Sequence, residues 1–485
     1  MVYHLGVDQG TTNTKVVLYN GKKIIYTVTK KIPINFTREG WVEQNANLII
    51  DNIIFCIKQI IKISKVNINK IESAGIANQT ETFVVWDKKS GKPVIPAISW
   101  QCKRSSELLI KYKNNFNLKE IGRKTGLNLD ATFTATKILW LKINYPHIYN
   151  KILNNKYLIG TVDTWIVWKL TKGKIYSTDA TNASRTLLCN TKKISWDQSL
   201  IDQFQLKRII LPEIKKNYDN FGKINKSYFG AEINIKATIG DQQASLFGNQ
   251  CLNKGDLKIT LGTGAFLWLN KGNKFFPKND TGCLETLSWF IDRPVFASEG
   301  FVIMAGSLLD YFIKNLNYAK NFSHFENISL KAKENDIFII PSLLGLGTPW
   351  WSSKSNGSIY GLNSKTTHED ICFSVFESVG FQIKAALDAL KKHSSISIKK
   401  ISIDGKLSSS KLMKKILSSL ICKDFYFSDN SDATAIGATL IASNNTFLST
   451  TKRTKYIFNE NKMHDYLINK YYIWKKLVDN STNPL

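Results

Sequence analysis

The segment YHLGVDQGTTNTKVVLY, from Tyr3 to Tyr19, decides how the chain begins to fold. Two apolar runs, Tyr3–Val7 and Lys15–Tyr19, flank a polar turn and predict two antiparallel strands. The dipeptide Asn20–Gly21 then predicts a hairpin into a third strand over 24–32. Because a strand and not a helix follows the glycine turn, this segment matches neither a Walker loop nor a dinucleotide-binding loop.

The turn between these strands, from Asp8 to Lys15, has the residues of an anion-binding site. Backbone N–H groups and the hydroxyls of Thr11 and Thr12 are suited to bind phosphate oxygens, and Lys15 adds a positive charge. Asp8 is suited to hold Mg²⁺, either directly or through water. An ordinary polar hairpin loop explains this segment equally well when it is taken alone.

A similar pattern recurs in the second part of the chain. The strands 256–261 and 265–269 are predicted to form a hairpin around Gly262–Thr–Gly264. A further hairpin, 285–291 with 294–298, is followed by a helix that is predicted to start near Gly300. The two openings predict a duplicated fold, although the similarity is too weak for a sequence repeat.

We expect two domains, residues 1–248 and residues 249–485, which face each other across a central cleft. Clefts of this kind are where ligands usually bind. In this arrangement the Gly262–Gly264 turn would contact the opposite end of a polyphosphate that is held by the Asp8–Lys15 turn.

Asp241 stands between a strand predicted to end at Gly240 and a helix predicted over 242–248. A hydroxyl group that attacks a γ-phosphoryl group needs a base to orient it and to accept its proton. Asp241 is the candidate for this role. A helix N-cap is the alternative interpretation of a lone Asp at such a position.

Composition excludes several classes of protein. The 485 residues are 43% hydrophobic and 21% charged, which predicts a large globular protein of two or three domains. The formal charge of +28 comes from scattered lysines without a basic block, so we expect no nucleic-acid partner, although such binding stays an alternative. The seven widely spaced cysteines predict neither disulfides nor a zinc site, and no segment predicts a membrane span. We therefore expect a cytoplasmic protein.

Taken together and in this order, the motifs resemble the FGGY family of carbohydrate kinases over nearly the whole chain, and most closely its glycerol-phosphorylating members. The resemblance rests on Val7–Thr12, Gly40–Glu43, Glu81–Asp87, Gly160–Trp165, Asn182–Thr186, Gly240–Ala244 and Gly357–Glu377.

The resemblance implies an α/β fold of two ribonuclease-H-like, actin-type ATPase domains, with ATP and Mg²⁺ as cofactors. It implies phosphorylation of a polyol hydroxyl, in the first place glycerol to glycerol 3-phosphate. Asp241 would be the catalytic base and Asp8 the metal ligand. The implied substrate-binding residues are Thr80, Glu81, Trp100, Thr132, Asp241, Gln242 and Phe266. The implied nucleotide-binding residues are Thr11, Thr12, Asn13, Lys15, Gly262, Thr263, Gly264, Gly306, Asp310, Gly405 and Lys406.

The chain departs from the family pattern at five of these positions, and the first is Lys15, where an arginine is usual. Thr80 and Thr132 stand where an arginine and a tyrosine are usual, which predicts a wider acceptor pocket. Lys406 replaces a glycine, and Asp310 replaces a glutamine. These departures leave two alternatives open: a kinase for a longer polyol or a ketose such as a tetritol, pentitol or xylulose-like sugar, and a non-catalytic nucleotide-binding protein. A homodimer and a homotetramer are both compatible with the sequence.

Overall fold

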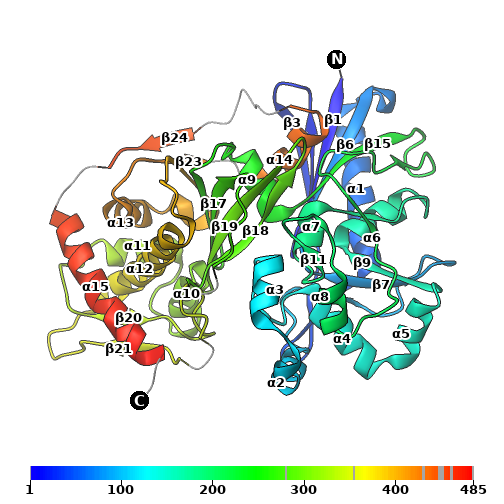
Figure 1. Cartoon of the computed structure of the whole chain (residues 1–485). Helices are drawn as coiled ribbons and strands as arrows, with labels where there is room; N and C mark the ends of the chain where they lie inside the picture. Colours follow the sequence, from blue (N-terminus) through cyan, green and yellow to red (C-terminus); the bar gives the residue numbers. More distant parts are fainter. Residues whose placement is uncertain are drawn as a thin grey trace.

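The computed structural model describes residues 2–278, 281–352, 355–428, 432–445, 453–458 and 462–482. Two halves, each built on a mixed β-sheet with helices packed against it, lie side by side (Figure 1). Apolar side chains fill a separate core around each sheet. A further cluster of buried residues joins the two halves at their junction.

The first sheet has the strand order β14-β15-β6-β1-β2-β3. Strands β1 to β3 form the predicted antiparallel meander, and β6 and β15 add to β1 in parallel. Parallel strands need a crossover connection, and α1 lies within the crossover from β3 to β6. The strands of this sheet are β1 (Tyr3–Gln9), β2 (Asn13–Tyr19), β3 (Ile24–Lys31), β6 (Ile71–Asn78), β14 (Lys223–Ile224) and β15 (Ile233–Gly240).

The second sheet repeats this plan with the order β18-β19-β17-β16-β22-β23-β24. Strand β16 pairs antiparallel with β17 and parallel with β22, as β1 does with β2 and β6. The predicted duplication is therefore confirmed at the level of topology. The strands are β16 (Asp256–Leu261), β17 (Ala265–Gly272), β18 (Leu284–Phe290), β19 (Pro294–Val302), β22 (Lys400–Asp404), β23 (Phe425–Ser428) and β24 (Arg453–Tyr456).

The first half carries an additional five-stranded sheet and, in its described residues, nine α-helices. The strands, in sheet order, are β4 (Asn35–Arg38), β5 (Trp41–Gln44), β8 (Ala97–Ile98), β7 (Phe83–Asp87) and β9 (Tyr157–Thr161). The helices are α1 (Ala46–Ser64), α2 (Ser106–Lys111), α3 (Leu118–Thr125), α4 (Thr134–Asn144), α5 (Pro146–Leu153), α6 (Val162–Leu170), α7 (Ala180–Ser184), α8 (Gln198–Gln203) and α9 (Asp241–Gly248). Two small pairs complete it, β10 (Ser177–Asp179) with β13 (Glu213–Lys215) and β11 (Cys189–Asn190) with β12 (Ser195–Trp196).

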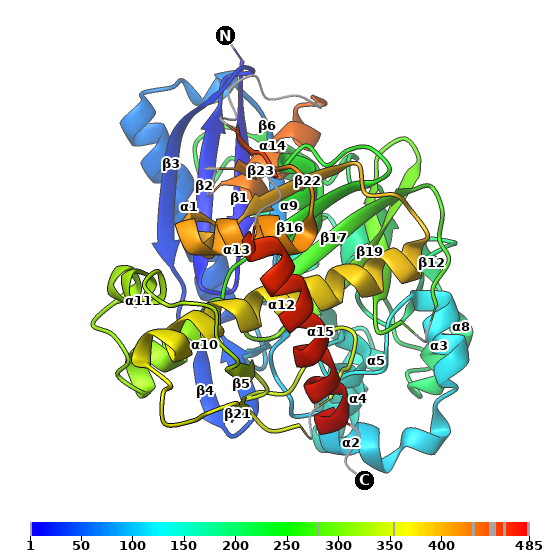
Figure 2. The ribbon, with the colours of Figure 1, turned by 90° about the vertical axis from the view of Figure 1, so that its left-hand side faces the viewer.

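In the second half, α12 packs against β17 and β19, with α11, α13 and α15 beside it (Figure 2). Helix α12 begins at a capping box, in which Thr367 and Asp370 satisfy each other's backbone N–H groups. The helices are α10 (Gly306–Asp310), α11 (Phe322–Ser329), α12 (His368–Ser394), α13 (Lys411–Ile421), α14 (Ala433–Ala442) and α15 (Lys462–Thr482). Strands β20 (Phe338–Ile340) and β21 (Ser358–Tyr360) form a small hairpin.

Helices α9 and α14 cross at the junction of the two halves. Each follows a parallel strand of its own sheet, β15 or β23, yet α14 packs against α9 and against β1 and β6 of the first sheet. Glycines permit this close approach, because a Cβ on Gly437 would lie 1.9 Å from the carbonyl oxygen of Ala244, and one on Gly248 would lie 2.0 Å from that of Ala433. The division of the chain after residue 248 stays a prediction.

The predicted helix near Gly300 is wrong. Strand β19 continues to Val302, and Gly300 pairs with Leu267 of β17 inside the sheet. The next helix, α10, begins only at Gly306. Glycine has a low intrinsic preference for strands, but here the pairing with β17 outweighs that preference. Within the described part of the chain, no helix has the length and apolar character that a membrane span requires.

Candidate active site

Asp241 is the first residue of α9, and the buried strand β15 leads directly into it. One of its carboxylate oxygens accepts a hydrogen bond from the backbone N–H of Gln242, at 2.7 Å. Burial, together with the negative charges of Asp8 and Glu81, raises the pKa of Asp241 to about 7. A carboxylate with such a pKa is well matched to accept a proton near neutral pH.

The Asp8–Lys15 turn brings together residues from both ends of the chain. Asp8 and Lys15 face each other across β1 and β2. The Lys15 ammonium also contacts Asp432, just before α14, with 2.7 Å between Nζ and Oδ1. Burial raises the pKa of Asp8 to about 6; the charge of Lys15 opposes this rise and that of Asp432 adds to it.

Two threonines lie at the tip of this turn: Thr11 is partly exposed and Thr12 is exposed. Thr12 and Asn13 are exposed, and their side chains bond to each other at 3.1 Å. The hydroxyl of Thr11 accepts a hydrogen bond from the indole N–H of Trp100 at 2.9 Å. The side chain of Gln44 donates to the Thr11 carbonyl at 2.6 Å. The structure thus places Trp100, a predicted acceptor-site residue, directly beside the first predicted phosphate turn.

The second turn, Gly262–Gly264, connects β16 to β17 and docks onto the start of α10. The carbonyl oxygen of Gly262 accepts the backbone N–H of Gly306 at 3.0 Å. The carbonyl oxygen of Thr263 accepts the backbone N–H groups of Ala305 and Ser307. A Cβ on Gly306 would lie 2.6 Å from the Gly262 oxygen, so a glycine is needed there. The structure therefore brings Gly262, Thr263, Gly264 and Gly306 together.

The remaining predicted nucleotide residues lie at two places. Gly405 follows β22 with a φ of +93°, and a Cβ there would lie 2.4 Å from the carbonyl oxygen of Leu261. Lys406 is exposed beside it, at the same end of the sheet as the second turn. Asp310 lies at the last residue of α10, and its side chain is 58% exposed and pairs with Lys314. Among the described residues, the Asp310 side chain pairs with Lys314 and not with the glycine turn.

Glu81 has the most constrained environment in the acceptor region. Its φ of +63° lies in the left-handed region, which is uncommon for a residue with a side chain and clusters at functional sites. Its two carboxylate oxygens accept hydrogen bonds from the Thr80 hydroxyl and from the guanidinium of Arg185, each at 2.6 Å. Arg185 also donates to Glu299 of β19, at 2.7 Å. This buried cluster crosses from the first half to the second.

Gln242 and Phe266, two further predicted acceptor residues, lie on α9 and β17. The ammonium of Lys258 donates to the side-chain oxygen of Gln242 at 3.0 Å. Because an ammonium has only donors, this contact leaves the amide N–H₂ of Gln242 free to donate elsewhere. The ring of Phe266 stacks on that of Phe301, with 4.8 Å between centroids. An amide and an aromatic face are suited to bind the hydroxyls and the C–H groups of a polyol, respectively.

The hydroxyl of Thr132 bonds to the neighbouring Asp130. The side chain and the backbone N–H of Thr132 both donate to the same oxygen of Asp130, at 2.6 and 2.8 Å. The carbonyl oxygen of Thr132 accepts from the buried ammonium of Lys137. Burial lowers the pKa of Lys137 to about 7, although the charge of Glu81 opposes this.

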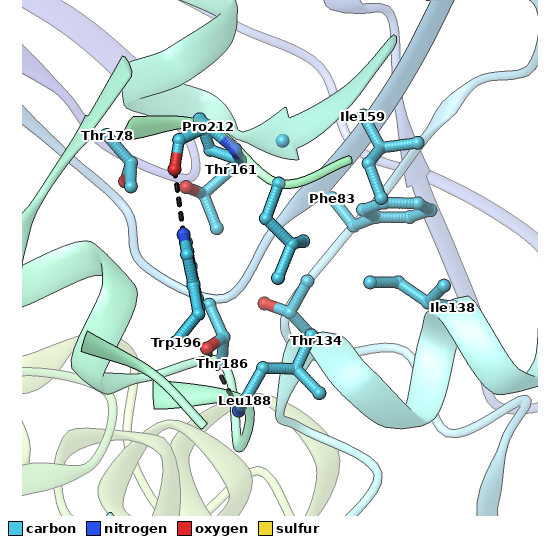
Figure 3. Close-up of a pocket in the computed structure, with 12 residues that line it drawn as sticks. Phe83, Thr134, Ile138, Ile159, Thr161, Thr178, Thr186, Leu188, Trp196 and Pro212 are labelled. Carbon is cyan, nitrogen blue, oxygen red and sulfur yellow. Dashed lines mark hydrogen bonds between the residues drawn. The ribbon is translucent and has the colours of Figure 1, made fainter. Parts of the chain in front are cut away.

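A small, mostly apolar pocket is lined by residues that neighbour the Glu81 cluster along the chain (Figure 3). Phe83 lies two residues beyond Glu81, the hydroxyl of Thr134 donates to the Glu81 carbonyl at 3.2 Å, and Thr186 follows Arg185. None of the predicted site residues lines this pocket. We interpret it as packing that supports the cluster. Its lining consists of Phe83, Thr134, Ile138, Ile159, Gly160, Thr161, Thr178, Thr186, Leu188, Trp196, Leu211 and Pro212.

The carboxylates of Asp8 and Asp241 fit a divalent cation. Burial is the main cause that raises the pKa of each carboxyl, and the negative charge of Asp8 further raises the pKa of Asp241, so a cation beside them would relieve this cost. Within the described residues no group of three or more His, Cys, Asp or Glu side chains is arranged for a metal. Mg²⁺ commonly binds through one or two carboxylates, with phosphates and water as its other ligands.

Three residues of this region were not predicted from the sequence. Arg185 belongs to the quoted Asn182–Thr186 motif, but no role was assigned to it. Lys258 is a lone lysine within the buried strand β16, and a charge at such a position is itself a signal. Asp432 has no comparable local signal, because it is separated from Lys15 by 417 residues.

Comparison with known proteins identifies the family. The models of the N-terminal and C-terminal domains of the FGGY family of carbohydrate kinases match residues 3–248 and 257–445. Glycerol kinases of Enterococcus casseliflavus and Bacillus anthracis are 37% and 36% identical to this chain. The matches cover 91% of this chain in both cases, and 88% and 89% of those proteins.

Solved structures agree with this result. The glycerol kinase of Plasmodium falciparum with ADP has a TM-score of 0.91 at 30% identity, covering 100% of this chain and 99% of that one. Xylulose kinase from Lactobacillus acidophilus, 20% identical, has a TM-score of 0.90 over 100% and 99% of the two chains and shares the fold. The predicted two-domain, actin-like ATPase fold is confirmed. This chain belongs to the FGGY family of carbohydrate kinases.

Proposed function

We propose that this protein transfers the γ-phosphoryl group of ATP to a hydroxyl of a polyol, and that glycerol is the acceptor, giving glycerol 3-phosphate. The observation that carries the proposal is Asp241, a carboxylate with a pKa of about 7 beside Glu81 and Gln242. The glycerol kinases that are 34–37% identical to this chain support glycerol among the polyols.

In this reaction Asp241 orients the acceptor hydroxyl and accepts its proton as the oxygen attacks phosphorus. Glu81 accepts a hydrogen bond from an acceptor hydroxyl, and the amide of Gln242 donates one. Trp100 and Phe266 cover the C–H groups of the acceptor. Closing this region off from water would suppress hydrolysis of ATP, which competes with transfer.

The nucleotide would lie between the two turns. Thr11, Thr12, Asn13 and Lys15 contact phosphate oxygens from the first half, and the Gly262–Gly264 turn and Gly306 contact them from the second half. Gly405 and Lys406 lie farther along, toward the nucleoside. Asp310 would contact the nucleotide only after its side chain leaves Lys314.

We include Mg²⁺ in this proposal, with Asp8 as its protein ligand and Asp241 as its neighbour. When bound, Mg²⁺ neutralises charge on the transferring phosphate oxygens. The chain's own contribution is to keep both carboxylates at the end of β1 and the start of α9.

The alternative acceptors are longer polyols and ketoses, because Thr80 and Thr132 are smaller than the family's usual residues. A coupled assay of ADP release tests this, with glycerol, erythritol, xylitol and xylulose as acceptors. We expect the highest kcat/KM with glycerol. A longer acceptor with a higher kcat/KM would replace glycerol in the proposal, and ADP release that no acceptor stimulates would refute the kinase function.

We also propose that the protein acts in the cytoplasm and assembles as a homodimer or homotetramer. Six of the seven cysteines are buried, and their wide spacing in the sequence does not fit a disulfide framework, which supports a reducing compartment. Size-exclusion chromatography with light scattering tests the assembly.

A further inference from the structure

Arg185 is a buried cation whose binding capacity is only partly used. It follows helix α7, and only 7% of the residue's surface is exposed. Its Nε donates to Glu81, and its Nη1 donates to Glu299. Although burial alone would lower its pKa, the two carboxylates hold the pKa of Arg185 above its usual value. The guanidinium therefore stays charged throughout the working range of pH.

The third nitrogen, Nη2, has no hydrogen-bond partner among the described residues. It is also not among the unpartnered nitrogen and oxygen atoms that are sealed from solvent. A guanidinium carries five N–H donors in a fixed plane, and protein atoms use two of them here. The unused edge is therefore accessible while the rest of the side chain is held rigidly.

This edge lies in the acceptor region. Glu81, which anchors Nε, is close enough to Asp241 for its charge to raise the pKa of that carboxyl. The hydroxyl of Thr80 donates to the other Glu81 oxygen, at 2.6 Å, and therefore does not compete with Arg185. The other buried cation near Asp241, Lys258, already donates to the side chain of Gln242, whereas the Nη2 edge of Arg185 is unused and can donate to a ligand hydroxyl beside Glu81.

Glu299 links the orientation of Arg185 to the second half of the molecule. It belongs to β19 of the second half, whereas Arg185 and Glu81 belong to the first half. The direction of the Nη2 edge is thus set by both halves together. A change in their relative position would release Nη1 and turn the donor away.

We propose that Arg185 binds the acceptor, with its Nη2 edge donating to a hydroxyl that is not phosphorylated, and that it thereby selects polyols over acceptors that lack this hydroxyl. This inference rests on the proposed function. Glu299 is a positioning residue in it, because it acts only through Arg185.

The test compares glycerol with propane-1,2-diol and propane-1,3-diol, each of which lacks one hydroxyl. In Arg185→Gln we expect kcat/KM for glycerol to fall about 10- to 100-fold, as for loss of a hydrogen bond to a charged group. For one of the two diols, kcat/KM should change less than threefold. The preference for glycerol over that diol therefore collapses, whereas the KM for ATP stays within twofold. An equal loss for glycerol and for both diols would mean a structural role only and would overturn the proposal.

Arg104→Gln is the matched control. Arg104 is also a buried arginine of the first half and pairs with Glu43 at 2.6 Å, but it packs between Trp41 and Trp140. We expect this variant to lose thermal stability without a change in the preference for glycerol. If its preference falls as much as that of Arg185→Gln, the effect is not specific to Arg185.

Two further variants keep the test decisive. Arg185→Lys keeps the positive charge but loses the forked guanidinium. A preference for glycerol over the diol that is at least fivefold lower in this variant supports the proposal, even if Arg185→Gln does not fold. An unchanged preference refutes it. Glu299→Gln should give an intermediate loss. The proposed function is judged separately on the unmutated protein: if that protein prefers another polyol, the same ratios are measured with that polyol and its deoxy forms.

Discussion

The turn between β1 and β2 and the turn between β16 and β17 occupy equivalent places in two sheets of the same topology. The first turn carries Asp8, Thr11, Thr12 and Lys15, whose side chains have charges and hydroxyls. The second turn carries two glycines and one threonine, and its contacts to α10 are made largely by backbone groups. The same fold thus provides side-chain chemistry in one half and close backbone approach in the other.

This difference explains where substitutions should affect chemistry and where they should affect binding. In the proposed reaction, charges that develop during transfer would be stabilised chiefly by side chains of the first turn, which lie near Asp241. The turn of the second half offers mainly backbone N–H groups and space, while charged side chains elsewhere in that half, Lys258 and Asp432, contact Gln242 and Lys15. We therefore expect kcat effects from the first half and effects on the KM for ATP from the second.

The largest effect is expected from Asp241→Asn. The amide keeps the shape of the side chain but cannot accept the hydroxyl proton, so kcat should fall about 10²- to 10⁴-fold. ADP binding, measured by calorimetry, should change little. A variant that keeps more than about a tenth of the kcat would rule out the role of Asp241 as general base.

Lys15→Ala should lower kcat about 10²- to 10³-fold, the usual cost of losing a donor to charge that develops during the reaction. The acceptor KM should stay constant. Asp432→Asn serves as the partner variant, because it removes the 2.7 Å ion pair but keeps the ammonium. If Lys15→Ala raises only the acceptor KM, Lys15 does not contact the phosphates.

Activity should depend on pH through the ionisation of Asp241. Its pKa is raised to about 7, and the base works only when ionised, so kcat/KM should fall about tenfold per pH unit below 7 and level off above it.

Stability should depend on pH with the opposite sign. The folded protein holds a proton on Asp241 that the unfolded chain releases, so the free energy of unfolding falls as pH rises from about 4 to 7. Thermal melts of Asp241→Asn should lack the part of this fall in stability that Asp241 causes. If the melting temperatures of both proteins depend on pH in the same way, this prediction is wrong.

Gly306→Ala tests the backbone chemistry of the second turn. The added Cβ would lie 2.6 Å from the Gly262 oxygen, so the turn must shift, and we expect the KM for ATP to rise about tenfold with kcat within threefold. In Gly262→Ala the nearest protein atom is 3.7 Å away, so any rise in that KM reports on the approach of the nucleotide itself. If either variant raised only the acceptor KM, the turn would contribute to binding of the acceptor and not of ATP.

The smallest effect concerns the acceptor pocket. Thr80→Arg combined with Thr132→Tyr should shift the ratio of kcat/KM for glycerol over xylitol upward by about tenfold, since larger side chains exclude longer acceptors. The comparison needs both acceptors in one assay. A ratio that does not move means that these two positions do not limit acceptor length.

Local sequence was enough for most of the fold near the site. The predicted strands 256–261 and 24–32 agree with β16 and β3 to within one residue, because turn residues and apolar alternation act over a few positions. Gly300 shows the limit of such reasoning. A glycine after an apolar run predicts the end of a strand, but β19 continues through Gly300 because this residue pairs with Leu267 of β17.

The sequence by itself determined the family, the duplicated plan and the residues of both turns, since each depends on short motifs in a fixed order. Only the tertiary structure decided which charges meet. Lys15 contacts Asp432, and Arg185 joins Glu81 to Glu299, across separations of 417, 104 and 114 residues. No periodicity encodes such pairs, because a buried charge is stable only where packing of the two halves supplies its partner.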